Sequence, residues 1–130
     1  MDWEPQWLTR AIVEAIHHEQ IEEHGGSFGT RDEGLIDSAL SRPHSKWQYD
    51  PSADLFTLAA AYAFGLAKNH GFIDGNKRVA FMAAYVFLGI HDVEVEAQEP
   101  EVVEVMTALA SGEVSEQEMA NWLRGHSAEQ

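Results

Sequence analysis

The sequence has no cysteine and only three lysines among its 130 residues. The absence of cysteine excludes disulfide bonds and thiolate chemistry, and it leaves the redox compartment undetermined. Eight Lys and Arg face 22 Asp and Glu, which gives a formal net charge of −14. Because such a surface repels the phosphate backbone, direct binding of nucleic acid is not expected. The negative charge either favours a basic protein partner or simply keeps the protein soluble.

Long apolar runs are also missing. The longest uncharged stretches, 55–67 and 79–90, are too short to span a bilayer. The N-terminal segment MDWEPQWLTR lacks the basic start and apolar run of a signal peptide. We therefore expect a cytoplasmic protein without a membrane segment. Its length suits one domain, 1–130, built around a single core.

The two uncharged stretches predict the centre of the fold. LFTLAAAYAFGLA (55–67) and VAFMAAYVFLGI (79–90) are apolar on all sides. A helix without a polar face has to be covered all round, so these two are predicted to be buried helices. The expected fold class is all-α, with the other helices packed around this central pair.

A first helix is expected to begin near Pro5, a residue favoured in the first helical turn, and to stop at Gly25. Its buried face is predicted from apolar residues at helical spacing: Leu8, Ile12, Ala15 and Ile16. The neighbouring pair His17 and His18 is assigned to the solvated face rather than to a metal site.

The segment between the first helix and the central pair is predicted to contain a short helix. Asp32 is expected to cap it and Pro43 to end it. Residues 42–51 have no clear period and are expected to be irregular or a short hairpin. Within them, Trp47 and Tyr49 have two open roles, either contact with a partner or cover for the core.

The last forty residues show simpler patterns. HDVEVEA (91–97) alternates and is expected to be extended, and 101–110 is expected to be helical. Ser115 and Glu118 form a capping box that predicts one more helix. The final residues, 126–130, are expected to be frayed.

The segment HGFIDGNKR (70–78) separates the two central helices and holds the densest set of reactive side chains. The second central helix is expected to begin near Asn76, where unpaired N–H groups and the positive end of the helix dipole favour anions. Gly75 lets the backbone curl so that these N–H groups point at one spot, as in an anion nest. Lys77 and Arg78 place two cations where a helix normally disfavours them, which predicts a bound anion.

The other side chains of this segment complete a catalytic set. His70 is a proton acceptor near neutral pH, and Asp74 is a hard oxygen ligand suited to Mg²⁺ shared with phosphate oxygens. Phe72 is expected to anchor the loop in the core. Each residue alone could be a helix cap, a turn residue or surface charge. Together they suit phosphoryl or nucleotidyl transfer.

HGFIDGNKR resembles the signature of the Fic/Doc family. Fic proteins typically read H-P-F-x-[DE]-G-N-G-R, whereas the Doc (death-on-curing toxin) branch reads H-x-F-x-D-[GA]-N-K-R. Lys77, in place of the Fic glycine, puts this chain on the Doc side. The likeness extends to residues 25–43, to the lead-in AAAYAFGLAKNH and to the tail SGEVSEQEMANWLR, so it covers nearly the whole chain.

The resemblance implies a bundle of about six helices with the motif between two central ones. It implies that His70 is the base for a target hydroxyl and that Asp74 takes part in Mg²⁺ binding, with Lys77 and Arg78 completing the catalytic set. The phosphates of ATP would be held by Gly75, Asn76, Lys77 and Arg78.

The Doc branch implies a protein kinase that transfers the γ-phosphate of ATP to elongation factor Tu and stops translation. Two alternatives stay open, an AMP transferase of the ordinary Fic kind and a catalytically silent module that binds a nucleotide or a partner.

The resemblance also implies an inhibitor in trans. Self-inhibited Fic proteins carry [ST]-x-x-x-E-[GN], and the 130 residues contain no match. The expected partner is a Phd-type antitoxin whose disordered C-terminal segment folds into a groove on the toxin. The negative charge of the chain predicts that this segment is basic. A flap over the target peptide is expected in loop 25–34 and segment 42–51.

Overall fold

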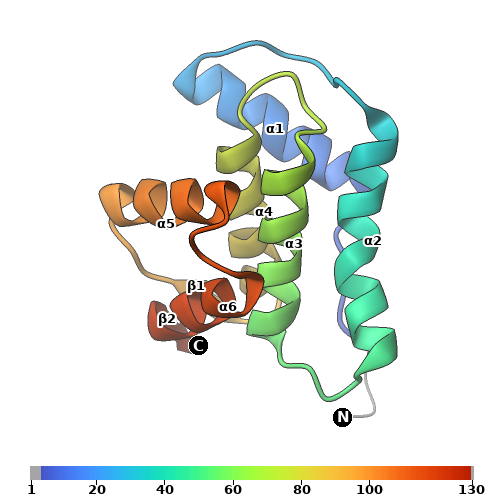
Figure 1. Ribbon diagram of the computed structural model, residues 1–130, viewed down its shortest axis with the longest axis vertical. Helices are drawn as coiled ribbons and strands as arrows, with labels where there is room; N and C mark the ends of the chain where they lie inside the picture. Colours follow the sequence, from blue (N-terminus) through green and yellow to red (C-terminus); the bar gives the residue numbers. More distant parts are fainter. Residues whose placement is uncertain (1–3, 130) are drawn as a thin grey trace.

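The computed structural model describes residues 4–129, which fold as an all-α bundle (Figure 1). The six helices of this part are α1 (Arg10–His24), α2 (Glu33–Tyr49), α3 (Leu55–Asn69), α4 (Asn76–Gly89), α5 (Glu99–Ser111) and α6 (Glu116–Gly125). Two short strands, β1 (Val93–Val95) and β2 (Ser127–Glu129), pair antiparallel. The expected fold class is confirmed. No helix in the described part is long and apolar enough to cross a membrane.

Helix α3 is the centre of the bundle and packs against α2, α4 and α6 (Figure 1). Every residue from Leu58 to Ala63 is 0% exposed. Small side chains bring the neighbouring helices close, since a Cβ added at Gly65 would lie 3.1 Å from the Cα of Ala39 in α2. The prediction of two buried central helices is confirmed, because a helix that is apolar on all sides is stable only when other elements cover it.

Helix α1 begins later than the sequence predicted. The Thr9 hydroxyl caps it by accepting a hydrogen bond from the Ile12 N–H (3.2 Å), whereas Pro5 lies buried in the segment before the helix. The end at Gly25 is confirmed. The predicted buried face was right only in part, since Leu8 is 5% exposed and Ile16 packs against the core, whereas Ile12 is 40% exposed. The residues of α1 that are buried are Val13, His17, Gln20 and Ile21. Two of these are polar, which a search for apolar periodicity does not detect.

Helix α2 continues through Pro43, so the predicted helix end and the irregular segment 42–51 were both wrong. The Asp32 cap is confirmed, because its Oδ1 accepts from the Leu35 N–H at 3.0 Å. A proline removes one hydrogen bond from a helix, that of its missing N–H. Pro43 is fully buried, and this packing retains the helix despite the lost bond.

The two aromatic residues at the end of α2 have different environments. Trp47 is half-buried and packs on Trp7, with ring centroids 5.9 Å apart, so it covers the core. Tyr49 is 94% exposed and lies at the end of α2 that is remote from the α3–α4 loop (Figure 1). Tyr49 therefore lies away from the segment that carries the predicted site.

The capping box of the last helix is confirmed. The Ser115 hydroxyl accepts from the Glu118 N–H (3.0 Å), and the Glu118 carboxylate accepts from the Ser115 N–H (2.9 Å). The helix predicted over 101–110 corresponds to α5, which is longer by two residues at its start and one at its end. These features depend on residues close in sequence, which explains why they were predicted.

The end of the chain is not frayed as predicted. Residues 127–129 form β2, which pairs with β1 so that Val95 lies opposite Ser127; Gln130 lies outside the described residues. The extended segment predicted in 91–97 is confirmed as β1. A lone strand leaves backbone groups unpaired, and β2 satisfies one edge of β1.

Burial of Tyr62 raises its pKa to about 12, against a hydrogen bond from the Leu8 N–H (2.9 Å) that lowers it. Tyrosine in an unfolded chain titrates near 10, so the neutral phenol stabilises the fold below about pH 10. This contribution is lost as the pH rises from about 10 to about 12.

We expect the melting temperature, measured by circular dichroism, to fall as the pH rises from about 10 to about 12. The fall should be smaller in Tyr62→Phe and unchanged in Tyr85→Phe.

Candidate active site

The motif loop, residues 70–75, joins the end of α3 to the start of α4 (Figure 1). His70 ends α3 in the left-handed conformation, with φ 50° and ψ 49°. Gly75 precedes α4 with φ 76° and ψ 16°. Glycine adopts this conformation without a steric penalty, so the loop turns sharply into the helix. The predicted helix start at Asn76 is confirmed.

The side chain of Asn76 clamps the motif loop. Its Oδ1 accepts from the Phe72 N–H and its Nδ2 donates to the Phe72 carbonyl, both at 3.0 Å. Phe72 is 2% exposed, so its predicted role as an anchor in the core is confirmed. The Asn76 side chain therefore holds the motif loop itself, and the phosphate contact expected of this residue stays a prediction.

The start of α4 offers free backbone donors. Its first helical hydrogen bond runs from the Val79 N–H to the Gly75 carbonyl (3.0 Å). The N–H groups of Asn76, Lys77 and Arg78 come before this bond and have no acceptor within the helix. We call these three N–H groups the anion nest. They lie beside a cavity of about 290 Å³ that brings the predicted site residues together: His70, Asp74, Gly75, Asn76, Lys77 and Arg78.

The carboxylate of Asp74 is exposed and held by backbone donors. The N–H groups of Ser27 (3.1 Å) and Gly75 (2.8 Å) bond to its two oxygens and lower its pKa, with a further contribution from Arg78. The group is therefore ionised at neutral pH. One ionised carboxylate beside a phosphate site fits the way proteins share Mg²⁺ with a nucleotide. Residues 4–129 contain no cluster of three or more His, Asp or Glu suited to a metal.

The glycine-rich segment 25–32 lies along the motif loop. Thr30 forms a bridge with Phe72, and the Ile73 N–H donates to the Gly29 carbonyl (3.1 Å). This part of the expected flap is thus next to the site. The other part, 42–51, was wrongly placed there, because 42–49 continues α2 away from the motif loop (Figure 1).

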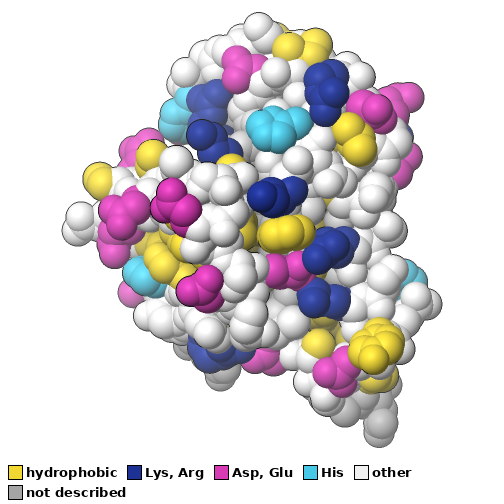
Figure 2. Space-filling view, viewed as in Figure 1, with side chains coloured by type: hydrophobic (Ala, Val, Ile, Leu, Met, Phe, Trp, Pro, Cys, Tyr) yellow, Lys and Arg dark blue, Asp and Glu magenta, His cyan; other side chains and the backbone are white. Residues whose placement is uncertain are grey.

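The cations near the motif loop lack acidic partners. Arg10, Arg42, Lys46 and Arg124 each pair with a carboxylate. In residues 4–129 no carboxylate lies within ion-pair distance of the remaining four, which are Arg31, Lys68, Lys77 and Arg78. Figure 2 shows Lys and Arg side chains on this face both near the motif loop at the top and lower down over α2 and α3. A chain of net charge −14 thus places four of its eight cations around one loop without a carboxylate at ion-pair distance, which favours an anionic ligand there.

Arg31 and Lys68 bond to backbone carbonyls around the motif loop. Arg31 donates to the His70 carbonyl (2.7 Å) and the Asn69 carbonyl (3.2 Å), and so caps the end of α3. Lys68 donates to the Ala110 carbonyl in α5 (3.3 Å). These contacts hold the segment that carries His70 without neutralising either cation.

Gly71 allows the motif loop to approach α2. A Cβ at this position would lie 2.4 Å from Cγ1 of Ile36, which is fully buried. We expect Gly71→Ala to lower the free energy of unfolding by about 1–3 kcal/mol through overpacking, measured by urea denaturation. Gly89→Ala is the control, because a Cβ there meets nothing within 4 Å. The control should be neutral or stabilised by about 1 kcal/mol.

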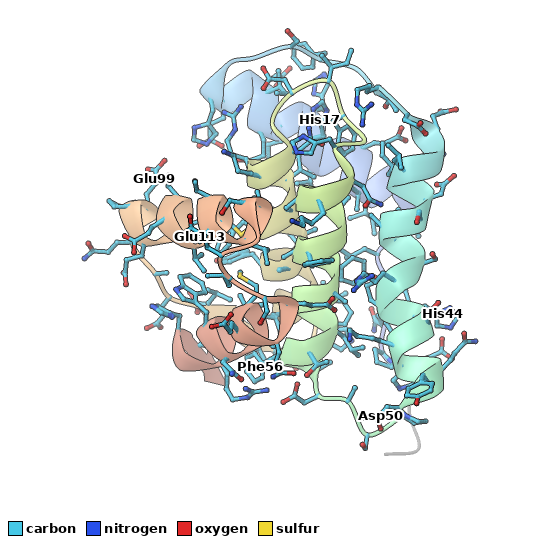
Figure 3. The ribbon with its side chains drawn as sticks, in the orientation of Figure 1. His17, His44, Asp50, Phe56, Glu99 and Glu113 are labelled. Carbon is cyan, nitrogen blue, oxygen red and sulfur yellow. The ribbon has the colours of Figure 1, made fainter. Side chains whose placement is uncertain are left out.

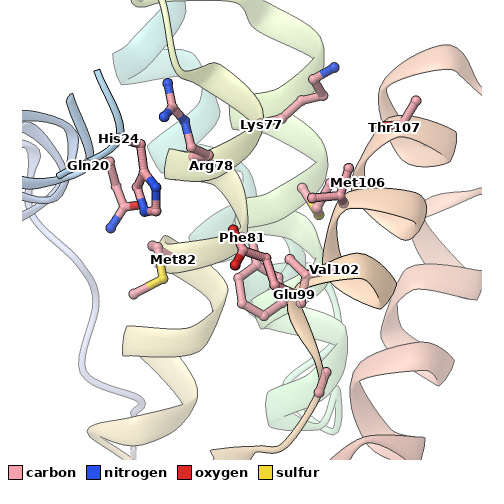
Figure 4. A pocket seen from close by; sticks show the side chains of 12 residues that line it. Gln20, His24, Lys77, Arg78, Phe81, Met82, Glu99, Val102, Met106 and Thr107 are labelled. Carbon is pink, nitrogen blue, oxygen red and sulfur yellow. The ribbon is translucent and has the colours of Figure 1, made fainter. Parts of the chain in front are cut away.

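A groove of about 450 Å³ adjoins the anion nest, between α1, α4 and α5 (Figure 4). Its lining is mostly apolar and includes Phe81, Met82, Val102 and Met106. Lys77 and Arg78 line both this groove and the cavity at the motif loop. A molecule bound in the groove would therefore lie next to the anion nest.

His17 does not lie on the solvated face of α1 as predicted. It is 4% exposed, and its Nε2 donates to the Asp74 carbonyl at 2.9 Å. His18 is exposed, as expected. The spacing of Val13, His17 and Ile21 was a signal for a shared helix face, which polarity alone obscured.

Comparison with known proteins agrees with the geometry. A family model described as the Fic/DOC family matches residues 7–88. The chain is 34% identical over 110 residues to "Protein kinase doc" of Escherichia phage P1. These aligned residues are 85% of this chain and 86% of that protein. It is 43% identical over 74 residues to "Toxin Doc" of Mycolicibacterium smegmatis, and these aligned residues are 56% of this chain and 57% of that protein.

Proposed function

The chain belongs to the Fic/Doc family, and from this premise we propose that it is a Doc-type toxin that acts as a protein kinase. The proposed reaction transfers the γ-phosphate of ATP to a Ser or Thr hydroxyl of a translation factor, with elongation factor Tu as the target. The similarity to a protein kinase Doc over most of both chains supports this choice.

One observation carries the proposal. The motif loop and the start of α4 place His70, Lys77, Arg78 and the anion nest around one cavity of about 290 Å³. The Lys77 side chain in particular makes no hydrogen bond or ion pair with any residue of 4–129, although it stands in the first turn of α4. A cation at a helix N-terminus is unfavourable without an anion. A phosphate group bound to the N–H groups and to Lys77 would remove this cost.

The proposed mechanism assigns one role to each group. His70 takes the proton of the target hydroxyl. The hydroxyl oxygen bonds to the γ-phosphorus of ATP, and the bond between the γ-phosphorus and the oxygen of the β-phosphate breaks, which releases ADP. The anion nest, Lys77 and Arg78 hold the phosphate and stabilise the charge that develops on it. Asp74 would hold Mg²⁺, which neutralises phosphate charge when bound.

The test uses ATP labelled at the α or the γ phosphate. The purified protein is incubated with elongation factor Tu, and label from the γ position alone is the expected result. Label from the α position would support the AMP transferase, and absence of label would support a silent binding module. Mass spectrometry of the modified target identifies the hydroxyl.

Lys77 is expected to be essential for γ-phosphate transfer. Lys77→Gly removes the unpaired charge of the first turn, so transfer should fall by at least about tenfold, a loss of about 1.4 kcal/mol of transition-state stabilisation. Lys46→Gln, on α2 away from the loop, is the control and should keep the wild-type rate. A Lys77→Gly enzyme as active as the wild type would remove Lys77 from the catalytic set.

We also propose an antitoxin of the Phd type as the partner, with its C-terminal segment folding into the groove between α1, α4 and α5. The groove is mostly apolar and is lined in part by Lys77 and Arg78, so a bound segment would cover two cations of the phosphate site. The expectation that this segment is basic stays a prediction.

Val103, which lines the groove and is 59% exposed, offers a test of the antitoxin site. Val103→Asp should weaken binding of an antitoxin peptide, measured by calorimetry, while ATP binding is retained.

A further inference from the structure

His17 joins α1 to the motif loop from behind (Figures 1 and 3). Its ring stacks on Phe72, with centroids 4.0 Å apart and planes at 10°. Its Nε2 lies 2.9 Å from the carbonyl oxygen of Asp74. Since a carbonyl oxygen only accepts, Nε2 carries the proton in this hydrogen bond. A buried histidine thus makes one directed bond to the backbone of the loop that precedes the anion nest.

The Asp74 carbonyl has a particular position relative to α4. In an α-helix the N–H of each residue donates to the carbonyl four residues earlier. The acceptor that a longer α4 would offer the Arg78 N–H is therefore the Asp74 carbonyl. That carbonyl is bonded to His17 instead, and the first helical bond is made by Val79. No hydrogen bond joins the Arg78 N–H to this carbonyl, and the Arg78 N–H stays available to a ligand.

Gly75 alone does not fix this arrangement. Its left-handed conformation interrupts the helix, but glycine is conformationally permissive, and the peptide between Asp74 and Gly75 can rotate at low cost. The Asp74 side chain is held on its other side by the Ser27 N–H (3.1 Å). Residue 74 is thus held at two points, its carboxylate by Ser27 and its carbonyl by His17.

We infer that His17 is a positioning residue of the anion nest. It holds the Asp74 carbonyl away from α4 and so keeps the Arg78 N–H as a donor to phosphate. The inference rests on the proposed function for the identity of the anion, but it requires binding only and no transfer.

Two substitutions separate the contacts of His17. His17→Phe keeps an aromatic ring against Phe72 and has no donor for the Asp74 carbonyl. His17→Gln keeps an N–H donor at a comparable distance from the backbone and loses the ring. Val13→Ala is the control for stability, because it removes buried methyl groups from the same helix. His18→Phe is the control for the exposed neighbour.

The experiment is a titration of the labelled protein with inorganic phosphate, followed by NMR at the Arg78 amide. His17→Phe is expected to bind phosphate about tenfold more weakly, which is the typical loss when one hydrogen bond to a charged ligand is removed. Its Arg78 amide hydrogen should also exchange more slowly, because the released Asp74 carbonyl can now accept it. His17→Gln should stay within about threefold of the wild type, since its donor is kept. Val13→Ala should lower the melting temperature and leave phosphate binding unchanged.

Two outcomes would overturn the inference. One is a His17→Phe variant with wild-type phosphate affinity and wild-type exchange at Arg78. The other is a wild-type protein whose Arg78 amide does not respond to phosphate. If His17→Phe fails to fold, His17→Asn replaces it, because the shorter amide does not reach the carbonyl. A wild-type protein that binds phosphate but transfers no label would refute the kinase and leave the role of His17 intact.

Discussion

Substitution of His70 by alanine is expected to lower kcat for phosphate transfer by about 10²–10⁴-fold, the usual contribution of a general base. The imidazole is exposed at the edge of the cavity that also contains Asp74 and Lys77. The phosphate donors lie on α4 and are unchanged by the substitution. The KM for ATP should therefore change by less than about threefold, the pattern of a lost transition-state interaction.

The measurement is steady-state transfer of label from γ-labelled ATP to the target protein. His18→Ala is the matched control, since His18 is exposed on α1 and contacts Phe28 rather than the motif loop. The control should keep the wild-type kcat. A His70→Ala enzyme that transfers phosphate as fast as the wild type would refute the role of His70 as base.

Asn76→Asp should be the most destabilising of the substitutions considered for the motif loop. The change replaces an N–H donor, 3.0 Å from the Phe72 carbonyl, with a carboxylate oxygen in a site that is 8% exposed. We expect the free energy of unfolding to fall by about 2–4 kcal/mol, because a buried charge would face a carbonyl without a partner. An acid at a helix N-terminus is favourable by only about 0.3–1 kcal/mol. The loss should therefore exceed the gain.

Urea denaturation of Asn76→Asp provides the measurement. Asn121→Asp, on the exposed face of α6, is the control and should change stability by less than about 0.5 kcal/mol. Phosphate binding should also weaken in Asn76→Asp, because the added negative charge adjoins the anion nest. An unchanged unfolding midpoint would show that the hydrogen bonds between Asn76 and Phe72 do not hold the motif loop in place.

Several features could be predicted because their cause lies within a few residues. The capping box of Ser115 and Glu118 and the start of α4 at Asn76 belong to this group. The same holds for the burial of α3 and α4, since a helix with no polar face has one stable environment. The order of residues in 70–78 was sufficient to bring the N–H groups and the two cations together at the helix start, and the anion that they would bind stays a prediction.

Other features depended on segments that are distant in the sequence. Pro43 is a helix breaker by local rules, but its burial in the core keeps α2 continuous. The end of the chain forms β2 only because β1 offers an unpaired edge. Segment 25–32 has a fixed position because its backbone pairs with the motif loop. None of these partners is visible in the local pattern.

The sequence by itself determined the all-α fold class, the two central helices and the residues of the motif loop. Only the tertiary structure decided how that loop is oriented, and His17 is the clearest case. In the sequence, His17 and its neighbour His18 look alike, as two adjacent polar residues on one helix. In the structure only His18 is exposed. In the folded protein the His17 ring lies on Phe72 and its Nε2 holds the Asp74 carbonyl. A directed hydrogen bond needs both partners in place, and these two are brought together only when α1 packs behind the motif loop.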